Sequence, residues 1–344
     1  MLKIYSSKKW LLPTKPHNIM LYPFWGEARV DKNDPDFGRF DDYCSLGKKY
    51  FELVENIEYC DIAIYPCDLN PGKESIIHLK SIAAETKAKN KKLLVFYNAD
   101  DDKDYEVENV ILFRTSFYKS LHEKNVYAFP GWSLDFKNYF PSNELFYLEK
   151  KIKPMVSYCG YIDYTTRTLS QHIKAFIKPK KDNESQAKKL RGNACRKIMN
   201  NKKIETNFII RNGFWAGDIA DKNTARKEYA NNMINSTYAL VARGGGNFSY
   251  RLYEVLSCGR IPVFINTDCM LPFDSTIDWK KHVVWVEENE LNKIDEKIVS
   301  FHIEKSNEEL KNIQISNREL YENFISPIGF YKTLSLFLKE IASH

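Results

Sequence analysis

An arginine followed by three glycines begins the stretch of the sequence with the clearest chemical content, "RGGGNFSYRLYE" at residues 243–254. The run "TYALVAR" (237–243) is typical of a buried strand, and the residues after the glycines have helical spacing. Glycines at such a junction let the backbone approach an anion closely and adopt positive φ where needed. The helix start adds unpaired N–H groups and a partial positive charge. We therefore predict an anion site here.

The side chains of this stretch suit a nucleoside diphosphate. Arg243 and Arg251 can form charge-assisted, bidentate hydrogen bonds with phosphate, and Asn247 or Ser249 can cap the helix or donate. Glu254 lies one turn beyond Arg251, where it can accept hydrogen bonds from ribose hydroxyls. The alternative for Arg251 and Glu254 is an ordinary helix salt pair. The predicted donor-binding set is Arg243, Gly244, Gly245, Gly246, Asn247, Ser249, Arg251 and Glu254.

Short apolar runs alternate with amphipathic stretches along the chain, which favours parallel sheets with crossover helices. The first series of expected strands is 60–66, 92–98 and 109–115, with a helix at 76–91. The second series is 155–161, 206–212, 237–243, 260–266 and 282–288, with helices near 166–178, 224–236, 247–258 and 303–323.

A charged stretch, "LEKKIKP" at 148–154, separates the two series and is interpreted as a linker. The sequence therefore predicts an α/β protein with two doubly wound, Rossmann-like domains. The predicted boundaries are 1–150 for an N-terminal, acceptor-side domain, 151–326 for a C-terminal, nucleotide-binding domain, and 327–344 for a terminal amphipathic helix.

Composition limits the class of protein. A formal charge of +6 over 344 residues fits an acidic small ligand without requiring nucleic acid. Seven scattered cysteines without metal spacing indicate reduced thiols. There is no signal-peptide core, and no apolar run is long enough to span a membrane. We expect a cytoplasmic location.

The basic run "KPKKDNESQAKKLRGNACRKIMNNKK" at 178–203 is interpreted mainly as a solvated helix face with a loop. Contact with an anionic surface or a polyanion is the alternative. Aromatic residues do not interleave with the charges, which weakens a nucleic-acid interpretation.

The block from Arg243 to Glu288 closely resembles the exostosin family, glycosyltransferase family 47. The resemblance is carried in order by Arg-Gly, Ser-Tyr-Arg-Leu-Tyr-Glu-Val-Leu, Gly-Arg-Ile-Pro-Val, Leu-Pro-Phe and Ile-Asp-Trp. Upstream, 229–244 matches the family's lead-in and 157–167 resembles the first strand and loop of its C-terminal half. The resemblance is specific in the C-terminal half and faint over residues 1–150.

This resemblance implies a GT-B fold, with two Rossmann-like domains facing across a cleft and the donor held mainly by the second. It also implies inverting transfer of a sugar from a nucleotide sugar, with UDP as the best nucleotide and GDP as the alternative. Animal members carry an N-terminal anchor and a further transferase domain, so we expect a microbial or viral enzyme. The acceptor is expected to be a glycan or glycoconjugate, with no nucleic-acid partner and with peripheral membrane contact left open.

Inverting transfer needs a base for the acceptor hydroxyl and stabilisation of the departing diphosphate. The glycine stretch with Arg243 and Arg251 supplies the second function in place of a metal, with Arg211 as a further donor-binding residue. No metal or cofactor is expected. Candidates for the base are Glu27, Asp100 and Asp163, each after an expected strand or beside a glycine or aromatic turn.

Two alternatives remain open at this point. The first is a metal-dependent GT-A-like transferase, in which Asp100 and Asp102 of "NADDD" (98–102) hold Mn²⁺ or Mg²⁺. The two series of strands argue against it, because that fold is a single nucleotide domain. The second is a non-catalytic glycan- or polyanion-binding protein that uses the basic run at 178–203.

Overall fold

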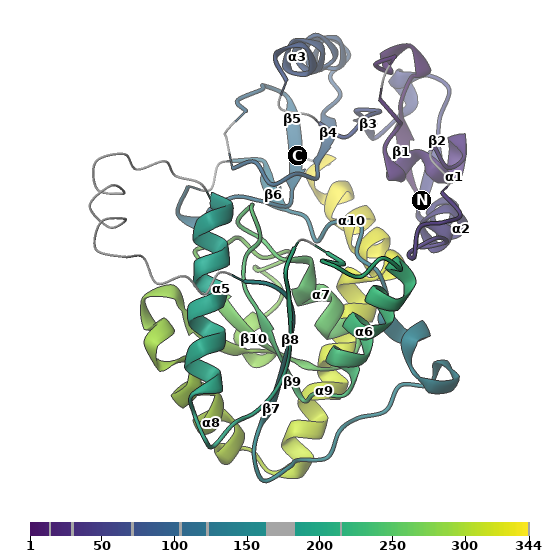
Figure 1. The fold of residues 1–344 in the computed structure, drawn as a ribbon. Coiled ribbons are helices and arrows are strands. Elements are labelled where there is room, and N and C mark those ends of the chain that lie inside the picture. The colour runs from purple at the N-terminus through teal and green to yellow at the C-terminus, as the bar shows by residue number, and fades with distance from the viewer. Residues whose placement is uncertain are drawn as a thin grey trace, which may run out of the picture. The chain divides into compact units, whose positions relative to one another are not determined.

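The computed structural model describes residues 1–13, 15–28, 31–69, 72–102, 105–121, 124–162, 183–213 and 215–342. The chain divides into two compact units. The first unit combines Met1–Asp135, Asp268–Ile277 and Glu319–His344, and the second combines Phe136–Thr267 and Asp278–Arg318. Each unit is built on its own parallel sheet (Figure 1).

The first unit has a six-stranded parallel sheet in the order β2-β1-β3-β4-β5-β6. Its strands are β1 (Leu2–Tyr5), β2 (Phe51–Leu53), β3 (Ile62–Ile64), β4 (Leu93–Tyr97), β5 (Val110–Arg114) and β6 (Val126–Ala128). Its helices are α1 (Tyr22–Trp25), α2 (Asp41–Tyr50), α3 (Lys73–Ala88) and α10 (Pro327–Ala342).

Alternation along β4 shows how this sheet is covered on both faces. Leu94 and Phe96 belong to a core cluster that includes α10 through residues such as Leu334. Leu93 and Val95 belong to the opposite cluster, which includes residues of α3. Because successive side chains of a strand point to opposite faces, one continuous apolar run serves two cores.

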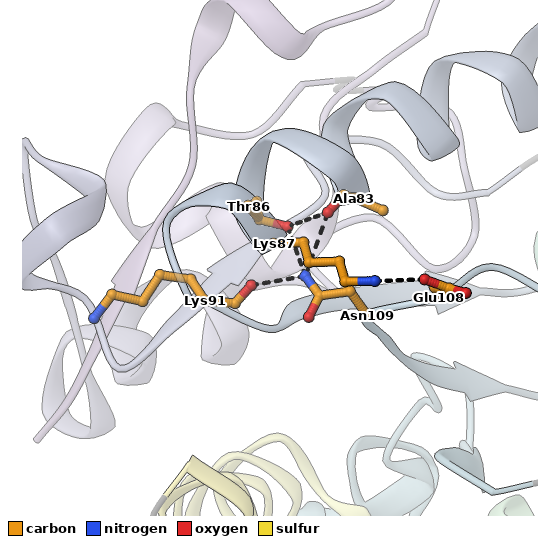
Figure 2. A network of polar contacts seen from close by, with 6 residues as sticks. All are labelled: Ala83, Thr86, Lys87, Lys91, Glu108 and Asn109. Carbon is orange, nitrogen blue, oxygen red and sulfur yellow. Dashed lines mark hydrogen bonds and ion pairs between the residues drawn. The ribbon is translucent and has the colours of Figure 1, made fainter.

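Helix α3 ends in a polar network around Asn109, which precedes β5 (Figure 2). Its Nδ2 donates to the carbonyl oxygens of Ala83 (3.3 Å) and Lys91 (2.8 Å) and to Oγ1 of Thr86 (3.1 Å). Asn109 has a φ of 65°, a conformation that Asn adopts more readily than most residues. The amide therefore satisfies carbonyls left over at the helix end and fixes α3 to the sheet.

The second unit has a five-stranded parallel sheet in the order β11-β10-β9-β7-β8. Its strands are β7 (Met155–Tyr161), β8 (Glu205–Arg211), β9 (Tyr238–Val241), β10 (Ile261–Asn266) and β11 (Val284–Glu287). Its helices are α5 (Asn183–Met199), α6 (Lys222–Ile234), α7 (Tyr250–Ser257), α8 (Ile294–Glu304) and α9 (Asn307–Leu320), the last reaching beyond the unit by two residues.

Helices cover both faces of this sheet as well. Helices α5 and α8 lie on one side of the strands, and α6 and α7 lie on the other (Figure 1). Leu190 and Ile198 of α5 and Ile298 of α8 share a core cluster with Val156 and Tyr158 of β7. The prediction of two doubly wound, Rossmann-like units is therefore confirmed, and such units are the components of the GT-B fold.

Every strand expected from the sequence is present, each within a few residues of its expected bounds. The helices expected at 76–91, 224–236, 247–258 and 303–323 correspond to α3, α6, α7 and α9, and the terminal helix is α10. The helix expected near 166–178 lies outside the described residues. All seven cysteines are free thiols. In the described part of the chain, no helix is both long and apolar enough to cross a membrane.

Candidate functional site

The strand order places the glycine stretch at a topological switch point. In the second unit, β7 pairs with β9 on one side and with the next strand in sequence, β8, on the other. The strands are all parallel, but the order in which successive strands are added across the sheet reverses between β7 and β9. Ligands of open parallel sheets bind outside the carboxyl ends of the strands at such a point. The segment that follows β9 is the predicted anion-binding stretch at 243–249.

The backbone of the glycine stretch does not use the positive φ that glycine permits. Gly244, Gly245 and Gly246 all have negative or extended φ, since none is among the described residues with positive φ. Among the described residues, a Cβ built on Gly244 would meet only the Phe248 carbonyl oxygen, 3.8 Å away, and the N–H of Gly244 donates to this oxygen at 3.0 Å. Gly244 and Gly245 are partly buried and Gly246 is buried, so the space beside Gly244 is what the glycines leave for a ligand.

Arg251 lies on the first turn of α7 and reaches across to β7. Its Nη2 donates to the carbonyl oxygen of Cys159 at 2.5 Å, and its Nε donates to the hydroxyl of Tyr229 at 3.2 Å. Its guanidinium stands over the ring of Tyr158 at 4.6 Å. Gly160 makes this approach possible, because a Cβ there would lie 3.2 Å from Nη2 of Arg251. Arg251, which is predicted to bind phosphate, is thus a cation that the protein already holds in position at the switch point.

Glu254 is linked to Arg251 through a tyrosine. The hydroxyl of Tyr229, on α6, donates to Oε2 of Glu254 while it accepts from Arg251. Burial and the nearby Glu254 carboxylate raise the pKa of Tyr229 well above its usual value. The simple helix salt pair considered from the sequence is therefore replaced by an Arg–Tyr–Glu chain, in which Tyr229 holds both charged groups.

Arg243 and Arg191 form a second cationic pair beside the glycines. Nη2 of Arg243 donates to the carbonyl oxygen of Gly245 at 3.1 Å, and Nη1 of Arg191 donates to the carbonyl oxygen of Arg243 at 2.9 Å. Burial lowers the pKa of Arg191, and the charge of Arg251 lowers it further. Arg191, Arg243 and Arg251 therefore converge on the carboxyl ends of β7 and β9.

Sequence reasoning missed Arg191, Tyr158 and Tyr229. Arg191 belongs to the basic run 178–203, which was interpreted as a solvated helix face. The buried neighbours Ala187, Leu190, Ala194 and Ile198 show that α5 turns this side of the helix toward the core. Their i, i+3, i+4 spacing around Arg191 was a signal that could have identified it. Residues 178–182 of the run lie outside the described residues.

The remaining predicted donor-binding residues have different surroundings. Asn247 is fully buried; its Nδ2 donates to the carbonyl oxygen of Thr267, and its Oδ1 accepts from the hydroxyl of Thr267 at 2.7 Å. It therefore fixes the bend to the end of β10. Ser249 occupies the N-cap position of α7, where its side chain makes no capping hydrogen bond within the described part of the chain.

Arg211 ends β8, directly opposite Tyr161 of β7. Its guanidinium is buried and pairs with Glu228 of α6 at 3.0 Å. It lies at the same carboxyl end of the sheet as the three converging arginines, but its guanidinium pairs with this carboxylate. It stays a predicted donor-binding residue.

The three base candidates are distributed over the chain. Glu27 follows the positive-φ Gly26 at the end of α1 and is partly buried. Asp100 lies in an exposed bend after β4. Asp163 lies outside the described residues. Glu27 and Asp100 therefore both belong to the first unit.

Asp68 is a carboxyl group of the first unit that sequence reasoning did not identify. It follows β3 and accepts a hydrogen bond from Nδ2 of Asn18. Burial raises the pKa of Asp68 from 3.8 to about 6. Burial, Glu27 and Asp68 together raise the pKa of Tyr22 to about 12, so these groups form one cluster. A carboxyl whose pKa lies near neutrality can exchange protons at working pH.

Asp102, one of the two aspartates considered for a metal, has a protein partner, as does its neighbour Asp101. The hydroxyl of Ser116 donates to Asp102, and the hydroxyl of Tyr97 donates to Asp101 at 2.9 Å. Among the described residues there is no group of three or more His, Cys, Asp or Glu side chains arranged to hold a metal ion.

Comparison with known proteins links the described geometry to a family. Residues 162–300 match the Exostosin GT47 domain. Over 80 residues the chain is 38% identical to Exostosin-1 of Drosophila melanogaster, covering 23% of this chain and 10% of that protein. Over 103 residues it is 35% identical to the Exostosin-1 homolog of Caenorhabditis elegans, covering 30% and 26%.

The matches thus span about a tenth to a quarter of the length of these curated relatives. Among solved structures, a glycosyltransferase from Rickettsia africae aligns over 89% of this chain and 88% of that chain, with a TM-score of 0.38 and 12% identity. The residues that match the family include the three converging arginines, Arg191, Arg243 and Arg251, and also Glu254.

Proposed function

From the exostosin GT47 domain that the chain carries over residues 162–300, we propose that this protein is a glycosyltransferase. It transfers a sugar from a nucleoside-diphosphate sugar, with UDP as the preferred nucleotide, to a hydroxyl of a glycan or glycoconjugate. The observation that carries this proposal is the convergence of Arg191, Arg243 and Arg251 on the open glycine bend at the switch point. Three cations beside a glycine bend that leads into a helix suit a diphosphate.

The proposed reaction is a single displacement. The acceptor hydroxyl oxygen bonds to the anomeric carbon as the bond from that carbon to the diphosphate oxygen breaks, so the configuration inverts. The electron pair leaves on the diphosphate, where the arginines and the N-terminus of α7 stabilise the charge. A carboxylate takes the hydroxyl proton. Glu27, Asp68, Asp100 and Asp163 are the candidates for this base.

We further propose that the transfer needs no metal ion and no cofactor, because the arginine cluster supplies the positive charge that a divalent ion provides in other transferases. The GT-A-like alternative predicts that transfer requires a divalent metal ion. Its Asp102 is hydrogen-bonded by Ser116, which supports a structural role for that carboxylate.

Thermal-shift measurements with UDP, GDP, pyrophosphate and UDP-sugars test the proposal. A ligand at 100 times its Kd adds about 2.7 kcal/mol of stability to the folded state. We expect stabilisation by UDP that is unchanged by EDTA, and NMR of the product should show an inverted anomeric centre. A protein that is stabilised by none of these compounds would contradict the proposal. Turnover abolished by EDTA and restored by Mn²⁺ would favour the GT-A-like mechanism instead.

A further inference from the structure

Trp215 stands at the exposed end of a column of alternating rings and arginines in the second unit. Arg226 lies over the ring of Trp215 at 5.3 Å and over the ring of Tyr229 at 5.8 Å. Arg251 lies over Tyr229 at 5.3 Å and over Tyr158 at 4.6 Å. The column therefore begins at the surface and ends beside the backbone of β7, where the arginines converge.

The position of Trp215 follows from the sheet. It lies in the loop after β8, the strand that pairs with β7. Its loop is therefore at the carboxyl edge of the sheet, the same edge as the glycine bend. Gly217 keeps the loop close to the strand, because a Cβ on Gly217 would lie 3.3 Å from Cβ of Arg211. Arg226 and Tyr229 are three residues apart on α6 and therefore share one helix face.

The backbone of Trp215 is strained and its side chain is not part of the core. Its φ is 59°, a left-handed conformation that bulky residues rarely adopt. Its side chain remains 39% exposed, although burying an indole is strongly favourable. A large ring that is held at the surface by a strained backbone, above a cation, is better explained by a ligand than by packing.

On the basis of the proposed function, we propose that Trp215 is the platform on which the nucleobase of the sugar donor stacks. The order of groups fits such a ligand. Along the column, Arg226 separates the planar indole from Tyr229, whose hydroxyl holds Glu254, the group proposed for ribose. Next comes Arg251, the group proposed for diphosphate. Every nucleobase has a planar face that can stack on an aromatic ring.

Calorimetric titration of Trp215→Ala with UDP, GDP and inorganic pyrophosphate tests this assignment. Of UDP and GDP, the nucleotide preferred by the wild-type protein should bind Trp215→Ala about 5- to 150-fold more weakly. Loss of one base–aromatic stack produces a decrease in this range. Binding of pyrophosphate should be unchanged, because it has no base. Trp215→Phe should retain most of the nucleotide affinity and should abolish any quenching of tryptophan fluorescence by nucleotide.

Trp285 provides a matched control. It also has a cation over its ring, Lys280 at 5.5 Å, but lies on β11 at the opposite edge of the same sheet. Trp285→Phe should bind nucleotide as wild type does and should keep the quenching.

Two results would overturn the assignment. The first is that Trp215→Ala weakens the binding of nucleotide and of pyrophosphate equally. The second is that Trp215→Ala binds nucleotide as tightly as the wild-type protein does, and this second result would leave the proposed function intact. A wild-type protein that binds neither nucleotide nor pyrophosphate would overturn both proposals.

Discussion

Nη2 of Arg251 donates a 2.5 Å hydrogen bond to the carbonyl oxygen of Cys159, so the side chain that begins α7 is anchored to the end of β7. The same guanidinium donates through Nε to Tyr229 and covers the ring of Tyr158. A cation held from three sides in this way does not need to reorganise when an anion arrives, which is the condition for strong electrostatic stabilisation.

Replacing Arg251 with alanine should lower turnover by about 10² to 10³-fold, the usual result of losing one such donor. Arg251→Lys should be nearly as severe, because an ammonium group lacks the planar fork that holds Cys159 and Tyr229 together. Steady-state kinetics with a UDP-sugar would measure both effects. Lys227→Ala, an exposed position on α6, is the control and should behave as wild type. A folded Arg251→Ala protein with turnover within tenfold of wild type would contradict the role of Arg251.

Gly160→Ala should disturb Arg251 without removing it. The added Cβ would lie 3.1 Å from the hydroxyl of Tyr158 and 3.2 Å from Nη2 of Arg251, so both side chains must move by a few tenths of an ångström. Overpacking of this kind costs about 1–3 kcal/mol of stability. We expect turnover to fall by up to about 10²-fold, because small misplacements of a positioning group are costly. Wild-type kinetics in this variant would show that the position of Arg251 is not critical.

Gly244→Ala should separate ligand binding from folding. The φ of Gly244 is not positive, and among the described residues the added methyl group would meet only the Phe248 carbonyl oxygen, at 3.8 Å. The unfolding midpoint should therefore stay near the wild-type value, with a change of stability within about 0.5 kcal/mol. Affinity for UDP and for pyrophosphate should both fall more than about tenfold, which corresponds to 1.4 kcal/mol, because the methyl group would occupy the space assigned to the anion. Undiminished affinity for both compounds would place the diphosphate elsewhere.

Asp68→Asn should change how stability depends on pH. Burial raises the pKa of Asp68 from 3.8 to about 6, so the folded chain holds this proton more tightly than the unfolded chain. Protonated Asp68 therefore contributes its full amount to the free energy of unfolding below about pH 4. This contribution is lost as the pH rises through about 6, and the loss amounts to up to roughly 3 kcal/mol. Asparagine stays neutral and keeps an oxygen that accepts from Asn18.

Thermal unfolding between pH 4 and pH 7 would test this linkage. As the pH rises, the thermal unfolding midpoint of Asp68→Asn should increase relative to that of the wild-type protein. Asp61→Asn, a change at an exposed position beside β3, should not reproduce the gain. Parallel curves for Asp68→Asn and wild type would mean that Asp68 titrates normally.

Hydrophobic runs were sufficient to predict the long strands of both sheets, because a strand buried on both faces is a continuous apolar segment such as Leu93–Tyr97. The strands β1, β2 and β6 were not predicted, because each is short and contains exposed or half-buried positions, whereas the equally short β3 is buried throughout. Arg243, Arg251 and Glu254 were identifiable because they are close in sequence to the glycines. Arg191, Tyr158 and Tyr229 reach the same place only through the sheet order and the crossover helices.

The purpose of the glycines could not be predicted either. A run of three allows both positive φ and close approach of a ligand, and the described positive-φ glycines include Gly217 and Gly259 and none of Gly244, Gly245 and Gly246. Sequence alone does not distinguish a glycine required by φ from one that leaves space for a ligand. Asp68 was missed for a related reason: its raised pKa depends on burial, which the turn-like sequence around it does not indicate.

Helix α10 contributes Phe330, Tyr331, Leu334 and Leu338, all fully buried, to the core of the first unit. That core also contains residues of β1, at the other end of the chain. During synthesis, the ribosome therefore releases β1 long before α10, the helix that completes the hydrophobic face of this sheet. Until α10 has been made, the strands synthesised before it keep that apolar face uncovered.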